Sequence, residues 1–149
     1  MANIFKDNIN RPNVVRFSVT SKSEPMIGIY VRSDTDKLRI FINSMIYTFI
    51  RGRSRAKVQI DLYGVSLDSS DSDPDDDALT SKSAPMPEEN TGFFEFNTSF
   101  DLDGRRLWNY DFLGIDIFIT SEPLNNSSQV YIPILRTIQP IVKVGEQHG

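Results

Sequence analysis

The chain has 149 residues, 39% of them hydrophobic and ten of them phenylalanine, which is enough to bury the core of one folded domain. It has no cysteine and one histidine, so disulfides, thiol chemistry, histidine-assisted nucleophiles and the usual zinc sites are excluded. The net charge is −4, but residues 68–90 hold eight acids and one base, so a mildly basic body of 15 bases and 12 acids carries an acidic insert.

The first residues lack the basic segment and apolar run of a secretory signal, and Ala2 excludes N-myristoylation. No apolar run approaches the roughly 18 residues that a membrane-spanning helix needs. We therefore expect a protein that is neither secreted nor transmembrane.

The first predicted elements are strands. Residues 1–12 read as a flexible arm without periodicity. Residues 13–20 alternate, with Val15, Phe17 and Val19 on one face, and residues 26–32 alternate again after a turn at 22–25. The short polar turn between the two strands predicts a hairpin.

Residues 34–51 are predicted to form one amphipathic helix. Asp34 suits the helix start and Gly52 a position just after its end. The β-branched residues in this segment favour the alternative of a hairpin turning at Asn43-Ser44, and we favour the helix because both ends have suitable caps. The apolar residues at 3–4 spacing are Leu38, Phe41, Ile42, Met45, Ile46, Phe49 and Ile50.

The remaining chain is read as strands separated by loops. A strand covers 56–67, and the polar, proline-containing segment 68–91 is predicted to be a long acidic loop. Strands follow at 92–102, 105–112, 113–120, 130–134 and 138–144, with a two-residue hairpin turn at Asp103-Gly104. Pro133 and Pro140 place the last strands at a sheet edge.

These elements predict an α+β, β-rich fold. It is a sandwich or twisted antiparallel sheet of six to eight strands, with the helix at about 34–51 packed on it. The predicted organisation is an arm at 1–12, a single β-rich domain at 13–144 and a tail at 145–149.

Constellations for enzymatic chemistry are weak. The pairs Asp101 with Asp103 and Asp111 with Asp116 read as hairpin and surface acids. The run Asp71-x-Asp73-x-Asp75 starts like a calcium-binding EF-hand loop but continues with Asp76 where glycine is required. We predict that the protein is not an enzyme and that it has neither a metal site nor a cofactor.

A basic stripe is the most specific binding feature. Arg51, Arg53, Arg55 and Lys57 share one face of an extended chain, with Arg39 close by on the predicted helix. Such a line of cations suits the phosphates of nucleic acid or of anionic lipids. The alternative, slightly favoured, is a solvated strand end that supports the helix dipole.

The order of elements over residues 13–120 resembles the small matrix proteins of negative-strand RNA viruses, of the rhabdovirus and bornavirus type. Lys82-Ser83-Ala84-Pro85 is similar to their Pro-Ser/Thr-Ala-Pro budding signal, with lysine in place of the first proline. The resemblance implies a nucleocapsid and an anionic membrane as partners. A phage capsid-cement or tail-accessory protein fits about as well.

We therefore predict a non-enzymatic structural or assembly protein of a virion, located in the virion and the host cytoplasm. It would act as a homo-oligomer bound to a larger viral scaffold, a capsid or nucleocapsid, through the basic stripe and the outward aromatics Tyr30, Tyr63 and Phe118. The alternatives are a nucleic-acid-binding module that uses the stripe and a calcium- or ligand-binding β-sandwich that uses the acidic loop.

Overall fold

The computed structural model describes residues 13–21, 24–25, 28–32, 37–48, 55–67, 75–86, 92–122 and 130–144. Most of these residues lie in strands. In chain order the elements are β1 (Asn13–Ser21), β2 (Glu24–Pro25), β3 (Ile29–Arg32), β4 (Leu38–Thr48), β5 (Arg55–Ser66), β6 (Asp75–Pro85), β7 (Gly92–Leu102), α2 (Gly104–Leu107), β8 (Phe112–Glu122) and β9 (Val130–Val144). The fold is therefore β-rich, as predicted, with almost no helix in the described residues.

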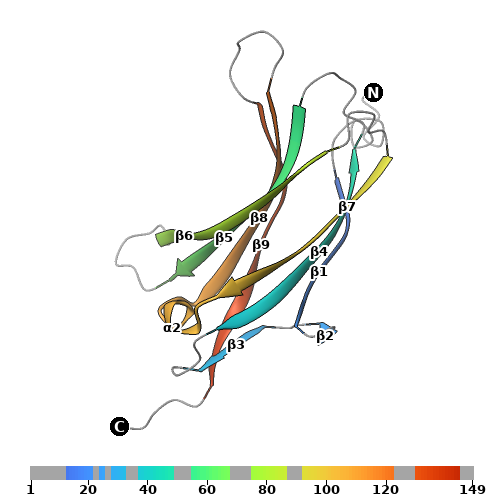
Figure 1. Ribbon diagram of the computed structural model, residues 1–149. Coiled ribbons are helices and arrows are strands. Elements are labelled where there is room, and N and C mark those ends of the chain that lie inside the picture. The colour runs from blue at the N-terminus through green and yellow to red at the C-terminus, as the bar shows by residue number, and fades with distance from the viewer. Residues whose placement is uncertain are drawn as a thin grey trace, which may run out of the picture.

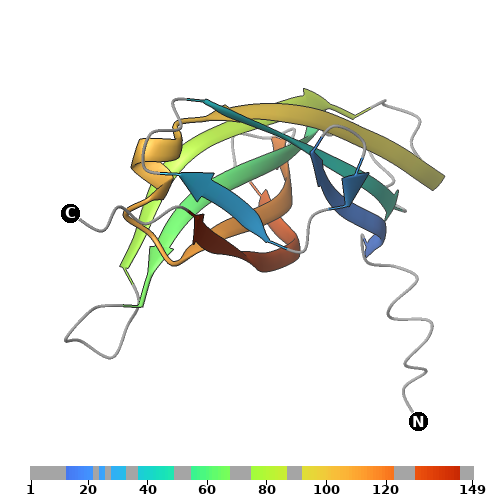
Figure 2. The ribbon, with the colours of Figure 1, turned by 90° about the horizontal axis from the view of Figure 1, so that it is seen from below.

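The strands form two sheets that pack as a sandwich. One sheet has four strands in the order β2-β1-β4-β7, and the other has five in the order β3-β9-β8-β5-β6. All the described pairings are antiparallel except that of β3 with β9. Figure 1 shows β1, β4 and β7 as one layer and β5, β6, β8 and β9 as the other. Seen from below, β4 and β7 lie over β8 and β9 (Figure 2).

The core lies between the two sheets and is filled by alternate residues of their central strands. Each strand directs every second side chain inward, so one face is apolar and the other is free for polar groups. The inward residues with at most 1% exposure on the three most buried strands are Ile40, Ile42 and Ile46 of β4, Val58, Ile60 and Leu62 of β5, and Leu113, Ile115, Ile117 and Ile119 of β8. Burial of each such side chain contributes roughly 1.5–3 kcal/mol.

The predicted helix at 34–51 is wrong, because Leu38–Thr48 is the strand β4. The hairpin alternative is wrong too, since β4 runs without a turn and pairs with β1 on one side and β7 on the other. Its outward face is also partly apolar: Phe41, Met45 and Tyr47 are half-buried. Phe41 and Met45 combine with Leu38, Ile42 and Ile46 to imitate a helical stripe, whereas the β-branched residues carried the correct signal.

The first predicted hairpin is also wrong, although both of its strands exist. β1 pairs with β4 in one sheet, whereas β3 pairs with β9 in the other. Ile29 and Val31 are fully buried there, beside the last strand of the chain. The chain reverses only briefly, in the short pairing of β1 with β2, and then crosses from one sheet to the other between β2 and β3.

The connection between β7 and β8 is not the predicted two-residue hairpin turn at Asp103-Gly104. These two strands belong to different sheets, so the chain crosses the end of the sandwich through the short helix α2. Asp103 caps this helix, accepting a hydrogen bond from the Arg105 backbone N–H at 3.0 Å. Leu107, 1% exposed, fills the end of the core. The strand predicted at 105–112 is therefore wrong.

Part of the predicted acidic loop is a strand. Residues Asp75–Pro85 form β6, the edge strand that pairs with β5 from Lys57 to Ser66. Most of its described side chains are exposed, so its pairing depends on backbone hydrogen bonds more than on an apolar face. The rest of the predicted loop (68–74 and 87–91), the predicted arm and the predicted tail lie outside the described residues.

The prolines Pro133 and Pro140 both lie in β9, where β8 pairs with residues 130–140. The described pairing of β9 with β3 covers only 141–144, so both prolines lie in the part of β9 that is paired on one side only, with β8. Among the described helices none has the length and apolar character that crossing a membrane requires.

Gly64 supplies a test of this packing. A Cβ at Gly64 would lie 2.5 Å from the Tyr110 ring, which covers the strand at that point. We expect Gly64→Ala to lower the free energy of unfolding by about 1–3 kcal/mol, because the ring must move out of a packed position. Urea unfolding of both proteins measures the difference.

Gly114→Ala is the matched control. Its Cβ would meet Val65 Cγ2 at 3.3 Å, which a small shift relieves. Alanine also reduces the conformational entropy of the unfolded chain, which stabilises the folded protein and offsets part of the cost of that contact. We therefore expect the free energy of unfolding to change by less than about 1 kcal/mol. Equal destabilisation by the two substitutions would contradict the close approach of Tyr110 to Gly64.

Candidate functional site

A row of charged side chains crosses the outer face of the five-stranded sheet. Asp61 of β5 is directly opposite Asp116 of β8, and Asp116 is directly opposite Arg136 of β9. Their neighbours Ile60 and Ile117 are fully buried in the core, so alternation turns these three residues to the other face. Three strands from distant parts of the sequence thus place two acids and one base side by side.

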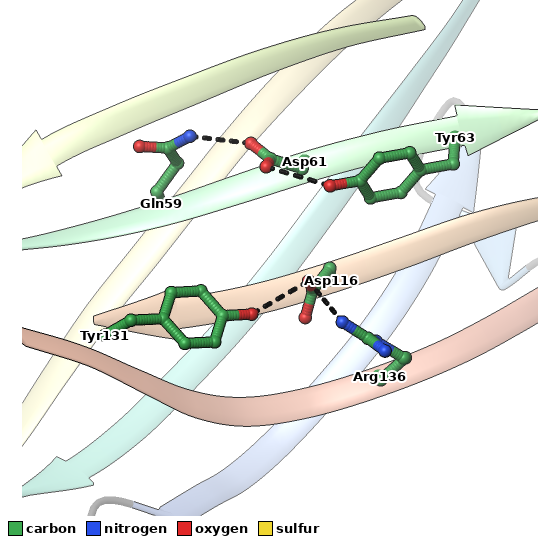
Figure 3. Close-up of polar contacts among 6 residues, drawn as sticks. All are labelled: Gln59, Asp61, Tyr63, Asp116, Tyr131 and Arg136. Atoms are coloured by element: carbon green, nitrogen blue, oxygen red, sulfur yellow. Dashed lines mark hydrogen bonds and ion pairs between the residues drawn. The ribbon is translucent and has the colours of Figure 1, made fainter. Parts of the chain in front are cut away.

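Each acid has its own hydrogen-bond donors (Figure 3). Asp116 Oδ2 accepts hydrogen bonds from the Tyr131 hydroxyl and from Arg136 Nη2, both at 3.1 Å. Asp61 Oδ1 accepts from Gln59 Nε2 at 2.7 Å, and its Oδ2 accepts from the Tyr63 hydroxyl at 3.2 Å. We call these six residues (Gln59, Asp61, Tyr63, Asp116, Tyr131 and Arg136) the aspartate cluster.

The position of Asp116 is electrostatically demanding. Its side chain is 5% exposed, whereas that of its ion-pair partner Arg136 is 77% exposed. Asp116 Oδ1 is buried and accepts no hydrogen bond from the described residues. A buried polar atom without a partner costs about 1–3 kcal/mol, and two carboxylates directly opposite each other on neighbouring strands add repulsion.

The tyrosines of the cluster are held in their neutral, hydrogen-donating form. Burial, followed by the charge of Asp61 and the hydrogen bond to it, raises the pKa of Tyr63. Burial, followed by the hydrogen bond to Asp116, raises the pKa of Tyr131. The pKa of the Arg136 guanidinium is raised by its hydrogen bond to Asp116 and by the charge of that carboxylate.

Two hollows flank Tyr63 on this face. One, of about 370 Å³, is lined by Tyr63, Val65, Gly114, Ile115, Asp116, Arg136, Thr137 and Ile138. The other, of about 220 Å³, lies toward β6 and is lined by Gln59, Asp61, Leu62, Tyr63, Ala78, Leu79, Thr80 and Ser81. Gly114 is opposite Tyr63 in the register, so the larger hollow has no side chain at that point of its floor.

The structure does not assemble the predicted basic stripe as a whole. Arg51 and Arg53 lie outside the described residues, Arg55 begins β5, and Lys57 is exposed on the outer face of β5. Arg39 is in the other sheet, so it does not extend the stripe. Its Nε and Nη2 donate to the two carboxylate oxygens of Asp101 at 2.7 and 3.2 Å.

The three predicted contact aromatics have different surroundings. Tyr30 is 58% exposed, as an outward residue should be. Tyr63 is half-buried within the aspartate cluster. Phe118 is only 6% exposed, because the Tyr131 ring covers it with the ring centres 4.6 Å apart. Phe118 is therefore not available at the surface, and the roles of Tyr30 and Tyr63 in contact with a partner stay predictions.

Sequence reasoning missed the aspartate cluster and misread Asp116 as a surface acid. Asp101 and Asp103 are exposed, as predicted for surface acids, and Asp111 accepts a hydrogen bond from the Leu67 backbone N–H instead of facing Asp116. The available signal was the position of Asp116 between Ile115 and Ile117, within a run of buried residues. The described residues contain no group of three or more acids, histidines or cysteines that could hold a metal ion.

Comparisons with known proteins identify no relative. No protein-family model and no curated protein matches the chain. An adhesin from the bacterium Mobiluncus mulieris matches in structure with a TM-score of 0.45 and 13% identity, over 87% of this chain and 49% of the adhesin. The putative ApaA protein from Bordetella pertussis matches with a TM-score of 0.34 and 12% identity, over 89% and 96% of the two chains. The chain thus spans about half of the adhesin, and likeness at this level identifies neither a family nor a function.

The hydrogen bond from Tyr131 to Asp116 predicts a titration. We expect the Tyr131 phenol to titrate above its ordinary pKa of about 10, and Asp116→Asn to move that pKa downward by removing the charge that disfavours the phenolate. NMR of the tyrosine ring carbons, assigned with Tyr131→Phe, measures this. Asp101→Asn, in the other sheet, should leave it unchanged.

The same shift has a consequence for stability. The pKa of the Tyr131 phenol is higher in the folded than in the unfolded chain. The contribution of Tyr131 to the free energy of unfolding is therefore fully present below pH about 10 and is lost as the pH rises through the folded value. We expect Asp116→Asn to make unfolding less dependent on pH in that alkaline range. A wild-type Tyr131 pKa at or below about 10 would contradict both expectations.

Proposed function

We propose that the protein is a non-enzymatic assembly domain that self-associates through the outer face of its five-stranded sheet and, in that form, binds a larger scaffold. The observation that supports this most is a group of exposed apolar side chains on that face. Tyr30, Ile138 and Val142 are 58%, 53% and 37% exposed, and Tyr30 is directly beside Val142 in the β3–β9 register. Exposed apolar residues gathered on one face are typical of interaction surfaces.

We propose that a second copy of the chain binds this face. The face carries both a base and an acid, so two copies related by a twofold axis can pair the base of one with the acid of the other. Lys57 and Asp61 lie on the same face of β5, four positions apart. At about 3.3 Å per residue this separates them by roughly 13 Å. A twofold axis through the face near Gln59 would set Lys57 of each copy over Asp61 of the other, as an isologous dimer requires.

The outer face of the four-stranded sheet is a weaker candidate. It also carries an exposed aromatic residue, Phe93, which is 64% exposed. Its charged groups, however, are matched within the face, since Arg16 pairs with Glu95 and Arg39 with Asp101. These pairs leave less charge for a partner to complement.

The scaffold itself remains a proposal from the sequence. In a matrix-like or capsid-accessory role, the scaffold would be a capsid or nucleocapsid. The described part of the basic stripe is the start of β5, with Arg55 and Lys57, and it would contact the phosphates or acidic side chains of that scaffold. Self-association does not depend on which scaffold is used.

Substitution of Tyr30 tests the proposed interface. We expect Tyr30→Ser to weaken self-association about tenfold or more, because truncating an exposed aromatic residue that the second copy buries can cost more than about 1 kcal/mol. Sedimentation velocity over a range of concentrations gives the dissociation constant, and rising salt should weaken association further through the charge pairs.

Phe93→Ser is the matched control, since Phe93 is an equally exposed aromatic residue on the opposite outer face. It should leave the dissociation constant unchanged. A wild-type protein that stays monomeric at high concentration and low salt would overturn the proposal, as would a loss of association caused by Phe93→Ser alone.

A further inference from the structure

We propose that the hollow beside Asp116 is a binding site for a cationic N–H donor on an aliphatic stem, the side-chain chemistry of lysine and arginine. This site is separate from the basic stripe, and it does not depend on self-association. It rests on a buried acceptor, on the net charge around that acceptor and on the apolar walls of the hollow.

The acceptor is Asp116 Oδ1. Its sister atom Oδ2 already accepts from Tyr131 and Arg136, whereas Oδ1 has no donor among the described residues although the side chain is only 5% exposed. Buried carboxylate oxygens normally accept hydrogen bonds, and their strongest donors are charged N–H groups. Oδ1 is therefore the one buried side-chain acceptor of the described residues that a ligand would satisfy.

The charge around Oδ1 favours a cation over a neutral donor. Asp61 is directly opposite Asp116, and Arg136 is the only base of the aspartate cluster, so the cluster has two acids and one base. An added ammonium or guanidinium group would balance the second carboxylate. Tyr63, which lines the hollow and is hydrogen-bonded to Asp61, adds an aromatic face of the kind that attracts cations.

The walls suit an aliphatic stem. Val65 and Ile138 line the hollow of about 370 Å³ together with the Tyr63 ring, and Gly114 places no side chain on its floor. Lysine and arginine bury such stems along apolar surface while their charged ends reach a polar group. Because Oδ1 is covered, a neighbouring side chain must move to admit the ligand. The Arg136 side chain, 77% exposed and bonded to Asp116 through Nη2, can rotate with little loss of packing.

The test uses n-butylammonium chloride as the probe and the full-length protein, observed through the backbone amide shifts of Gly114 and Asp116. We expect saturable shifts with a dissociation constant on the order of millimolar, as suits so small a ligand. n-Butanol, with the same stem and no charge, and sodium chloride at equal ionic strength should produce no saturable shift at these amides.

Variants separate the acceptor from the hollow. Asp116→Asn should weaken n-butylammonium binding about tenfold or more, and Gly114→Ala should weaken it by adding a methyl group to the floor without changing a charge. Asp101→Asn, an acid in the other sheet paired with Arg39, is the matched control and should bind as the wild type does. Unfolding curves show whether each variant is folded before it is titrated.

Three results would overturn the proposal. The first is an absence of saturable shifts in the folded wild type, which would indicate that a buried water satisfies Oδ1. The second is equal binding of n-butanol, which would make the hollow an apolar site only. The third is unchanged n-butylammonium binding by Asp116→Asn.

Two further measurements identify the source of the cation once the probe binds. If Lys57 of a second copy supplies it, Lys57→Met should weaken self-association and n-butylammonium should compete with it. If another polypeptide supplies it, a lysine-rich peptide should shift the same amides in the monomer. A monomeric protein that still binds n-butylammonium would overturn the proposed self-association and leave this site intact.

Discussion

The inward residues of β4, β5 and β8 must fill the space between the two sheets, and the register of every other group depends on that requirement. A shift of one residue in any of these strands would exchange its inner and outer faces. On β8 it would bring Asp116 into the core in place of Ile115 and Ile117, which are at most 1% exposed. Core packing therefore determines that Asp116 lies on the outer face, directly opposite Asp61.

The outer face of the larger sheet is consequently not a plain solvated surface. Facing carboxylates and a buried oxygen without a donor both oppose folding, and the ion pair with Arg136 and the hydrogen bond from Tyr131 act against that cost. Groups that oppose folding persist more often at sites of binding than elsewhere on a surface. This is the physical link between the aspartate cluster and the proposal that it receives a cation.

Much of the strand pattern could be predicted because its signal is local. The alternating residues of β1, β5 and β7 and the buried run of β8 reveal strands without knowledge of their partners. β4 could not be recognised in the same way, since it is central in its sheet and carries half-buried apolar residues on its outward face as well. β6 could not either, because an edge strand with few apolar side chains is stabilised by backbone pairing with β5, which leaves no periodicity.

By itself the sequence determined a cysteine-free, β-rich domain with a two-residue periodicity, and it excluded the chemistries that need thiols or several histidines. Only the tertiary structure decided which strands share a sheet, that β3 joins β9, and that α2 connects the layers. It also decided that Asp61, Asp116 and Arg136 meet, although 55 and 20 positions separate successive members of the row. The reason is that alternation depends on neighbours along one strand, whereas a cross-strand row depends on register, which the packing of the whole core sets.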